Sequence, residues 1–317
     1  MRAPRNRTIE LKPEEFEVFR RRLLVPEKIA DLDSVKNKII CGDTFEILKL
    51  LPEKSFDLLF ADPPYNLTKD FGTNSFKQTS LEDYEIWLDS WLGDCARLLK
   101  DTASVYICGD WRSAAAIQRA GMKYFTLQNR ITWEREKGRG ARRNWKSSSE
   151  DIWFFTASGE YTFNLESVKI KRKVIAPYTV GGKPKDWQKS ETGNFRLTSP
   201  SNLWNDLTVP FWSMPENTTH PTQKPEKLLA KIILASTNEN DLILDPFAGS
   251  GTTAVAAKKL NRAFCAVEMD EHYCLLTEKR LALAETDKKI QGFADGVFYE
   301  RNTLNRDKGR GARNERD

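Results

Sequence analysis

The stretch "LILDPFAGSGTTAVAA", residues 242–257, decides the fold. Its first three residues are apolar and predict a buried strand that ends at Asp245. A glycine-rich turn follows, and the small and apolar residues of 252–260 predict a helix. Strand, tight turn and helix form the first half of a βαβ unit, so this stretch predicts a sheet with helices packed on it.

The same alternation extends over most of the chain. We expect further strands at 35–41, 56–61, 103–108, 127–133 and 263–267, and helices at 13–24, 44–51, 112–120, 226–237 and 270–285, with Gly121 ending the helix at 112–120. Another helix begins after Ser80, where Trp and Leu residues recur at helical spacing. This pattern predicts an α/β fold with a mostly parallel, doubly wound sheet. Residues 134–216 are rich in Lys, Arg, Trp, Gly and Pro with weak periodicity, so they predict an insertion.

Composition limits the class of protein. The 317 residues, 39% of them hydrophobic, suffice for one large domain with an insertion or for two domains. The net charge of +5 permits a polyanionic partner. The N-terminus does not resemble a signal peptide, and no apolar run approaches membrane-spanning length. Five cysteines without a CxxC pair predict reduced core residues and a cytoplasmic protein, and two histidines leave little room for a metal site.

A second motif is "LLFADPPYNL", residues 58–67, in which an apolar strand ends on Asp62-Pro63-Pro64-Tyr65. Two prolines can simply make a stiff exit from a strand, with the tyrosine against the core. A rigid turn also holds a carboxylate, a carbonyl and an aromatic face at the carboxyl edge of the sheet. Ligands bind at that edge in open α/β sheets, so the motif indicates a functional site.

The glycine turn raises the question of its ligand. Gly249, Gly251 and Ala254 fit the loose dinucleotide pattern, and Glu268 stands at the spacing of a ribose-binding acid. Asp245 argues against a pyrophosphate, because an anion next to the turn repels phosphate. S-adenosylmethionine carries an ammonium group and a sulfonium instead, so it suits a turn flanked by acids.

Together these motifs resemble a known family. Asp62-Pro63-Pro64-Tyr65 with Phe247-Ala248-Gly249-Ser250-Gly251 resembles the S-adenosylmethionine-dependent amino DNA methyltransferases. The catalytic motif comes first, a long variable segment follows and the cofactor motif comes last, which resembles the β class. "HPTQKP", 220–225, is a further match. The resemblance implies a Rossmann-like methyltransferase fold with a target-recognition region inserted at 134–216.

The resemblance covers about residues 36–285, and we expect the whole chain to have five parts. We expect a basic N-terminal arm at 1–34, the catalytic half of the methyltransferase domain at 35–133 and target recognition at 134–216. The cofactor-binding half follows at 217–285, and a polar C-terminal tail at 286–317.

The expected chemistry concerns an exocyclic amino nitrogen whose lone pair is delocalised into the base. Asp62 and the carbonyl of Pro63 would each accept one N–H and direct the lone pair toward the methyl donor, with Pro64 keeping the turn rigid. Tyr65 would stack on a base flipped out of the duplex. The acid favours adenine N6 over the alternative, cytosine N4, and no cysteine follows a proline, which disfavours cytosine C5. A catalytically silent binding module and a nicotinamide oxidoreductase are the remaining alternatives.

The resemblance assigns binding roles to two sets of residues. The cofactor set comprises Asp43, Lys224, Asp245, Phe247, Ala248, Gly249, Ser250, Gly251, Thr252, Glu268 and Met269, although Asp43 also fits a plain turn and Lys224 a solvated charge. The expected phosphate contacts are a run of cations, Arg135, Lys137, Arg139, Arg142, Arg143 and Lys146. The expected partner is double-stranded DNA at the nucleoid, with a cognate restriction endonuclease and a homodimer as open possibilities, and no membrane.

Overall fold

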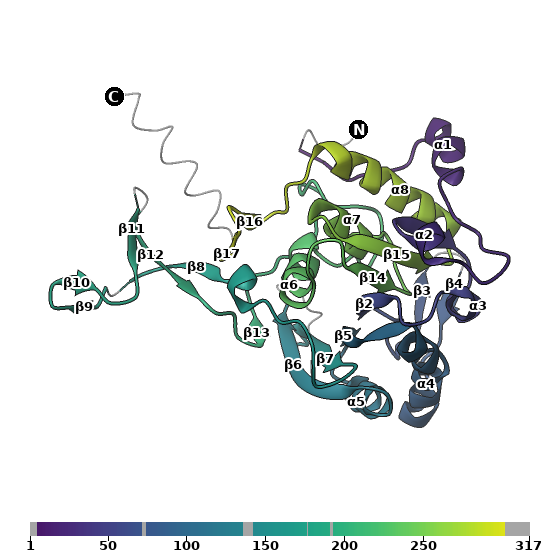
Figure 1. Cartoon of the computed structure of the whole chain (residues 1–317), viewed down its shortest axis with the longest axis horizontal. Coiled ribbons are helices and arrows are strands. Elements are labelled where there is room, and N and C mark those ends of the chain that lie inside the picture. Colours follow the sequence, from purple (N-terminus) through teal and green to yellow (C-terminus); the bar gives the residue numbers. More distant parts are fainter. Residues whose placement is uncertain (1–4, 72–73, 136–141, 176, 191–192, 302–317) are drawn as a thin grey trace.

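The computed structural model describes residues 5–71, 74–135, 142–175, 177–190 and 193–301. A large body built on one sheet carries a thin arm that projects from one side (Figure 1). Within the described residues, no helix has the length and apolar character needed to cross a bilayer.

The body is organised around an eight-stranded sheet. In order across the sheet these strands are β1 (Lys38–Cys41), β15 (Ala263–Glu268), β14 (Leu242–Asp245), β2 (Phe56–Ala61), β5 (Leu99–Gly109), β7 (Ser149–Thr156), β6 (Thr126–Glu134) and β13 (Leu203–Trp204). Neighbours pair in parallel except β7, which runs antiparallel to both β5 and β6. Strands β14 and β2 are adjacent, so the two sequence motifs lie side by side at the carboxyl edge.

Helices cover both faces of this sheet, as the sequence predicts. Alternate residues of β2 show it: Leu59 and Ala61 join a core with α3 (Thr44–Leu50), α4 (Leu81–Leu98) and α5 (Ala114–Met122). Leu58 and Phe60 face α6 (Glu226–Ser236), α7 (Thr252–Lys259) and α8 (Glu271–Thr286). The side-chain period of two along a strand places every second residue on each face, so both faces of this apolar strand are buried.

The 134–216 segment differs from the continuous insertion that its texture predicts. Strand β7 lies inside this range yet occupies the interior of the central sheet, between β5 and β6. Its run from Ile152 to Phe155 is buried, and Trp204 of β13 packs on the same body. The strand pattern of β7 is easily missed in the sequence, because basic residues precede it. The amino-acid composition of the long 134–216 segment is dominated by such residues and hides a strand as short as β7.

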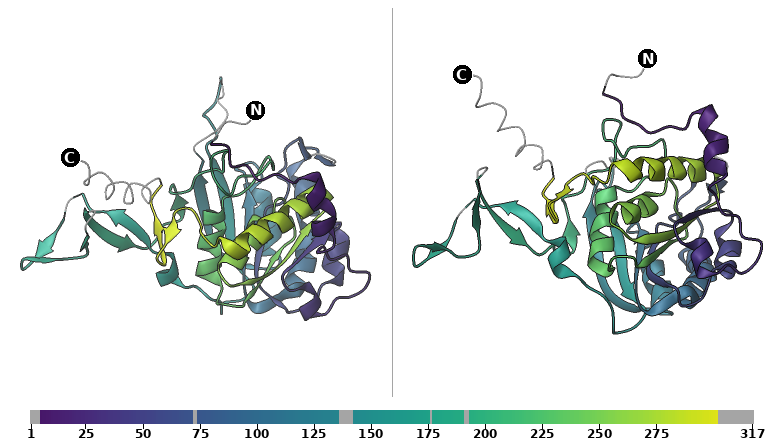
Figure 2. Two further views of the ribbon diagram at one scale, coloured as in Figure 1. Left: turned by 90° about the horizontal axis from the view of Figure 1, so that it is seen from above. Right: turned by 45° about the horizontal axis from the view of Figure 1, so that its top comes forward.

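The rest of the segment builds the arm. A second sheet has the order β11 (Gln188–Ser190), β12 (Gly193–Thr198), β8 (Ile170–Lys173), β17 (Val297–Tyr299) and β16 (Phe293–Ala294). A small hairpin, β9 (Thr179–Val180) with β10 (Lys183–Pro184), forms the outer part of the arm, which projects clear of the body in all three ribbon views (Figures 1 and 2). Three further short elements are β3 (Lys69–Phe71), β4 (Asn74–Phe76) and η2 (Leu165–Val168).

Both ends of the chain correct the sequence-based boundaries. The polar C-terminal tail predicted at 286–317 contains β16 and β17, because buried Phe298 and Tyr299 supply apolar contacts to the second sheet. The single helix predicted at 13–24 is instead η1 (Pro13–Glu15) and α1 (Phe16–Arg20). Leu24 forms an extended bridge with Ile40, so the chain has to leave the helix before it.

Two smaller boundaries also shift. The strand predicted from residue 35 begins at Lys38, since 32–35 form α2 (Leu32–Val35) and Asn37 has a positive φ of 59°. Gly121 lies inside α5 and does not end it. A Cβ on Gly121 would come within 2.5 Å of the Phe155 ring, so glycine allows the helix to approach β7 closely.

Candidate active site

The Asp-Pro-Pro-Tyr motif holds a buried ion pair. Asp62 follows β2 directly, and its Oδ2 accepts a hydrogen bond from Lys224 Nζ at 2.6 Å. Its Oδ1 accepts from the Tyr65 hydroxyl at 3.1 Å. The Asp62 side chain is 19% exposed and that of Lys224 is 8% exposed. The turn itself is fixed from outside, because the Tyr84 hydroxyl donates to the Pro64 carbonyl at 2.9 Å.

Two residues outside the motif complete this cluster. Glu150, in β7, accepts from the Tyr65 hydroxyl at 3.1 Å and lies 3.5 Å from Lys224 Nζ. Arg135, just after β6, forms an ion pair with Glu150. Two carboxylates and two cations therefore meet at the carboxyl edge of the sheet, brought there by four separate segments of the chain.

The charges of the cluster shift one another's pKa values. Burial raises the pKa of Asp62; Lys224 opposes that shift and Glu150 adds to it. Burial would also raise the pKa of Glu150, but Lys224 and Arg135 outweigh it and lower that pKa. Burial disfavours the charged form of Lys224, yet the two carboxylates raise its pKa above the ordinary value, so the amine stays protonated.

The glycine turn lies one strand away. Asp245, 3% exposed, ends β14 and accepts from the backbone N–H of Phe247 at 3.0 Å. Glu268, at the end of β15, accepts from the backbone N–H of Gly249 at 2.8 Å, which fastens the turn to the neighbouring strand. Gly251 has a φ of 72°, and a Cβ there would lie 2.0 Å from Thr277 Cγ2, so only glycine fits.

This edge of the sheet fits a cationic ligand. Burial raises the pKa of Asp245 to about 7, hydrogen bonds from Thr253 and the Phe247 backbone oppose the rise, and the nearby carboxylates of Asp62 and Glu268 add to it. Burial likewise raises the pKa of Glu268. A positive group bound here would relieve this repulsion, whereas a pyrophosphate would increase it. The carboxylates of Asp245 and Glu268 therefore suit the positively charged ammonium and sulfonium groups of S-adenosylmethionine.

Comparisons with known proteins agree with this geometry. The family model described as DNA methylase matches residues 56–279. The DNA adenine methyltransferase YhdJ of Escherichia coli (strain K12) is 36% identical over 250 residues, which cover 78% of this chain and 83% of that protein. The type II methyltransferase M.HpaI of Haemophilus parainfluenzae is 34% identical over 262 residues, covering 81% of this chain and 76% of that protein.

The chain belongs to the DNA methylase family. Among solved structures, the M1.HpyAVI–SAM complex superposes on this methylase with a TM-score of 0.53 at 26% identity, covering 77% of this chain and 98% of that one. The fold expectation, an α/β methyltransferase sheet of mostly parallel strands, is confirmed.

Several residues predicted to bind the cofactor have contacts within the protein. Lys224 pairs with Asp62. Asp43 is exposed and caps α3, accepting from the backbone N–H of Phe45 at 3.0 Å. Phe247 packs on Trp91, with ring centroids 5.0 Å apart, and Ala248 is buried beneath the turn. Met269, next to Glu268, is 49% exposed.

Arg280, in α8, is a structural residue of the turn that sequence reasoning missed. Its Nη1 donates to the Ser250 carbonyl at 2.6 Å and to Thr252 Oγ1 at 3.1 Å. Its Nη2 pairs with Glu226 of α6 at 3.1 Å, and its side chain is 1% exposed. Ser250 and Thr252 are buried, and their hydrogen bonds with this guanidinium hold the turn in place.

The predicted phosphate contacts separate into three groups. Arg135 lies in the carboxylate cluster of the active site. Arg142, Arg143 and Lys146 are exposed, and Trp145 beside them is 93% exposed. Lys137 and Arg139 lie outside the described residues.

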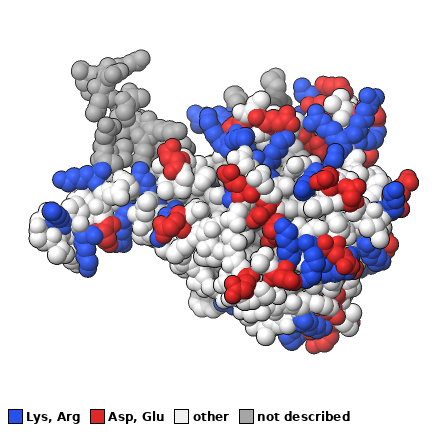
Figure 3. Space-filling view, in the orientation of Figure 1, with Lys and Arg blue, Asp and Glu red and all other residues white. Residues whose placement is uncertain are grey.

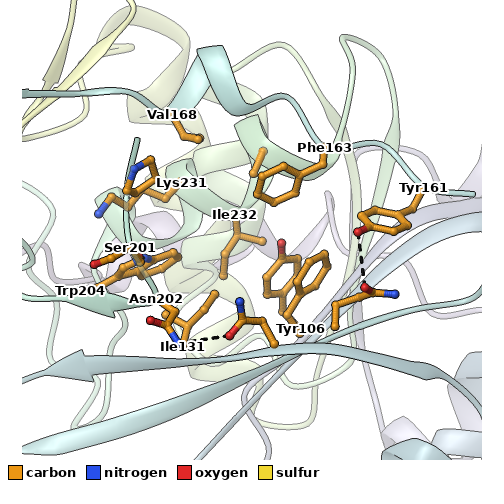
Figure 4. A pocket seen from close by; sticks show the side chains of 15 residues that line it. Tyr106, Ile131, Tyr161, Phe163, Val168, Ser201, Asn202, Trp204, Lys231 and Ile232 are labelled. Carbon is orange, nitrogen blue, oxygen red and sulfur yellow. Dashed lines mark hydrogen bonds between the residues drawn. The ribbon is translucent and has the colours of Figure 1, made fainter. Parts of the chain in front are cut away.

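A separate cavity of about 260 Å³ lies between the central sheet and α6 (Figure 4). Aromatic side chains form much of its wall, including Tyr106, Phe154 and Trp204, and the Tyr106 hydroxyl lies 2.8 Å from that of Ser236. None of its lining residues belongs to the motifs described above. The cavity is therefore distinct from the candidate active site.

We expect Arg280→Met to destabilise the methylase by about 3 kcal/mol, because it breaks a buried ion pair and leaves Glu226 and the Ser250 carbonyl short of a donor. Urea denaturation measures the change. The control is Arg20→Met, which removes the exposed partner of Glu271, a residue in the same helix as Arg280. This substitution should change the free energy of unfolding little. Equal effects of the two substitutions would contradict the bracing role of Arg280.

Proposed function

We propose that this methylase transfers a methyl group from S-adenosylmethionine to the N6 amino group of adenine in duplex DNA. The observation that carries the proposal is the Asp62 carboxylate, paired with Lys224 at the end of β2 and one strand from the acidic glycine turn. The similarity to a named DNA adenine methyltransferase, at 36% identity, supports the choice of base. The likeness to an S-adenosylmethionine complex, at 26% identity, supports the choice of cofactor.

The acidic edge is proposed to bind the cofactor. S-adenosylmethionine supplies an electrophilic methyl group on a sulfonium. Asp245 would face the positive part of the cofactor, and Glu268 would accept from ribose hydroxyls with the carboxylate lone pairs that its two backbone hydrogen bonds leave available. Phe247, Gly249 and Met269 line the same turn, and Asp43 lies at the end of β1 beside it.

The proline turn is proposed to bind the target base. Asp62 and the Pro63 carbonyl would accept the two N–H groups of the amino nitrogen, which disfavours its planar form and directs its lone pair at the methyl group. A preorganised charged acceptor is worth several kcal/mol in a water-excluded site. Tyr65 is half-buried, and its ring would stack on a flipped base.

The arm is proposed to carry most of the DNA contact. Residues 169–198 hold eight Lys and Arg against two acids, an excess of six positive charges, which is larger than the net charge of the whole chain. Figure 3 shows Lys and Arg side chains along the arm with a few acids among them, and many side chains of both signs on the body. Phosphate contact by such a surface fixes the position of the duplex. Target recognition would then rest on 134–148 and 157–216, outside β7.

The biological role is proposed by analogy with the relatives. Type II methyltransferases are among the similar proteins, so we propose a restriction-modification role with a cognate endonuclease acting on the same site. Work on chromosomal DNA would place the enzyme in the cytoplasm at the nucleoid. We also propose that the enzyme can act as a homodimer, which sedimentation of the purified protein would decide.

Asp62→Asn should abolish most methyl transfer while leaving cofactor and DNA binding largely intact. The substitution keeps the shape but removes the charged acceptor, so the single-turnover rate should fall at least about a hundredfold. Labelled cofactor with unmethylated genomic DNA is the assay. Asp57→Asn, in the same strand but away from the carboxyl edge, is the matched control and should keep the wild-type rate. A near-normal rate for Asp62→Asn would mean that the proline turn is only a strand exit.

Cofactor affinity should depend on the charge of Asp245. Its pKa lies near 7 and a bound cation favours the ionised form, so affinity should weaken about five- to tenfold between pH 8 and pH 6. Asp245→Asn should bind weakly at both pH values. Calorimetric titration measures both, with Asp241→Asn, just before the same strand, as a control that keeps the wild-type dependence. A variant with unchanged affinity would refute the assignment.

The arm proposal predicts a change in salt dependence. Lys183, Lys185 and Lys189 are exposed on the arm, and replacing all three by Gln should reduce the slope of log affinity against log salt by about 2 to 3. Fluorescence anisotropy with a labelled duplex measures the slope. The matched control replaces Lys49, Lys54 and Lys123 on the body, all exposed. If both triple variants lose slope equally, the arm is not the main DNA contact.

A further inference from the structure

The cluster around Asp62 contains an acid that the motifs do not explain. Glu150 is 7% exposed and lies in the antiparallel strand β7, away in sequence from both motifs. It contacts Tyr65, Lys224 and Arg135, and the first two of these also contact Asp62. A buried carboxylate costs free energy unless it has such partners, so its presence next to the reacting acid needs a reason.

We propose that Glu150 is a positioning residue that sets the charge environment of Asp62 and provides a second acceptor for the Tyr65 hydroxyl, with Arg135 moderating its effect. This inference rests on the proposed role of Asp62 as the acceptor of the amino group.

The first step of the argument concerns the shared lysine. Lys224 Nζ lies 2.6 Å from Asp62 Oδ2 and 3.5 Å from Glu150 Oε2, so one positive charge serves two negative ones. Glu150 adds a negative potential at Asp62 that opposes the positive potential of Lys224, and without its charge that opposition would be lost. The Asp62 carboxylate would then bind protons less tightly and accept the amino N–H groups less strongly.

The second step concerns the hydroxyl of Tyr65. It lies 3.1 Å from Asp62 Oδ1 and 3.1 Å from Glu150 Oε2, so its single proton has two equivalent acceptors. Lys224 already occupies Asp62 Oδ2. When the hydroxyl turns to Glu150, Oδ1 becomes available to the target amino group. This is a rotation about one C–O bond, so no covalent bond breaks and no proton is transferred.

The third step concerns Arg135. This residue follows β6 directly, and its ion pair with Glu150 links the beginning of the 134–216 segment to the catalytic carboxylate. Its side chain is 35% exposed, so its charge is partly screened by solvent. Arg135 thus reduces the field of Glu150 at Asp62 without cancelling it.

When the rate is plotted against pH, it should fall at low pH as Asp62 becomes protonated, because protonation of this carboxylate removes the acceptor. This acid limb of the pH–rate profile therefore reports on Asp62. The charged and titratable groups that face Asp62 from the surrounding elements are Lys224, Glu150, Tyr65, Tyr84, Cys108 and Asp245. Of these, Glu150 and Lys224 are the charged groups of the cluster itself, and Glu150 raises the pKa of Asp62. Removal of its charge should therefore move the limb to lower pH.

The test measures the single-turnover rate against pH, with saturating cofactor and DNA and with N6-methyladenine as the product. Glu150→Gln should lower the rate at neutral pH at least about tenfold and move the acid limb about one unit lower. Arg135→Met leaves Glu150 less neutralised, so it should move the limb the opposite way, to higher pH. The control is Arg130→Met, which removes an exposed cation of β6 that lies near Asp151 of β7. This variant should leave the acid limb at its wild-type pH.

The outcomes separate this inference from the proposed function. Opposite shifts of the limb in the two variants support the inference. An unchanged rate and limb in Glu150→Gln, or a loss of rate with the limb in its wild-type position, overturns it, because a merely structural acid would not move the titration. If Glu150→Gln does not fold, Arg135→Met alone decides by the presence or absence of its shift. A wild-type protein that makes no N6-methyladenine would instead refute the proposed function.

Discussion

The buried pair between Lys224 and Asp62 is the interaction on which the rest of the site depends. Two unit charges this far from water are stable only with close geometry and with all remaining hydrogen bonds made. Strand β2 positions the acid and the segment before α6 positions the lysine. That segment is itself fixed by Gln223, which accepts from the Thr218 backbone at 2.9 Å and donates to the Glu216 carbonyl at 2.7 Å.

The same edge of the sheet presents two buried acids with different partners. Burial raises the pKa of Asp62, but a lysine 2.6 Å away opposes that rise. Asp245, one strand away, accepts from neutral donors, the Phe247 backbone and the Thr253 hydroxyl, and its pKa rises to about 7. Such a difference suits a site that must keep one carboxylate as an acceptor and leave the other for a cationic ligand.

Much of this organisation follows from the sequence. The apolar runs that end at Asp62 and Asp245 predict adjacent strand ends, because parallel strands of one sheet share a carboxyl edge. The glycines of the turn predict a backbone that other residues rarely adopt, and the positive φ values of 54° at Gly249 and 72° at Gly251 agree.

Other features depend on contacts between distant segments, which a single sequence does not display. Glu150 and Arg135 meet Tyr65 and Lys224 only because β7 inserts between β5 and β6. In the sequence, Arg280 resembles a solvent-exposed arginine of a helix. Its buried ion pair with Glu226 exists only because α6 packs near α8. Strand β17 is three residues long and gains its place from pairing with β8, so its own pattern is too short to predict it.

The position of the transferred methyl group tests most directly whether Asp62 directs a lone pair of adenine. Unmethylated genomic DNA would be incubated with the protein and isotopically labelled S-adenosylmethionine, digested to nucleosides and analysed by mass spectrometry. Label confined to N6-methyladenine is the predicted result. Label in N4-methylcytosine, or no label in any base under conditions where the protein binds both cofactor and DNA, would contradict it.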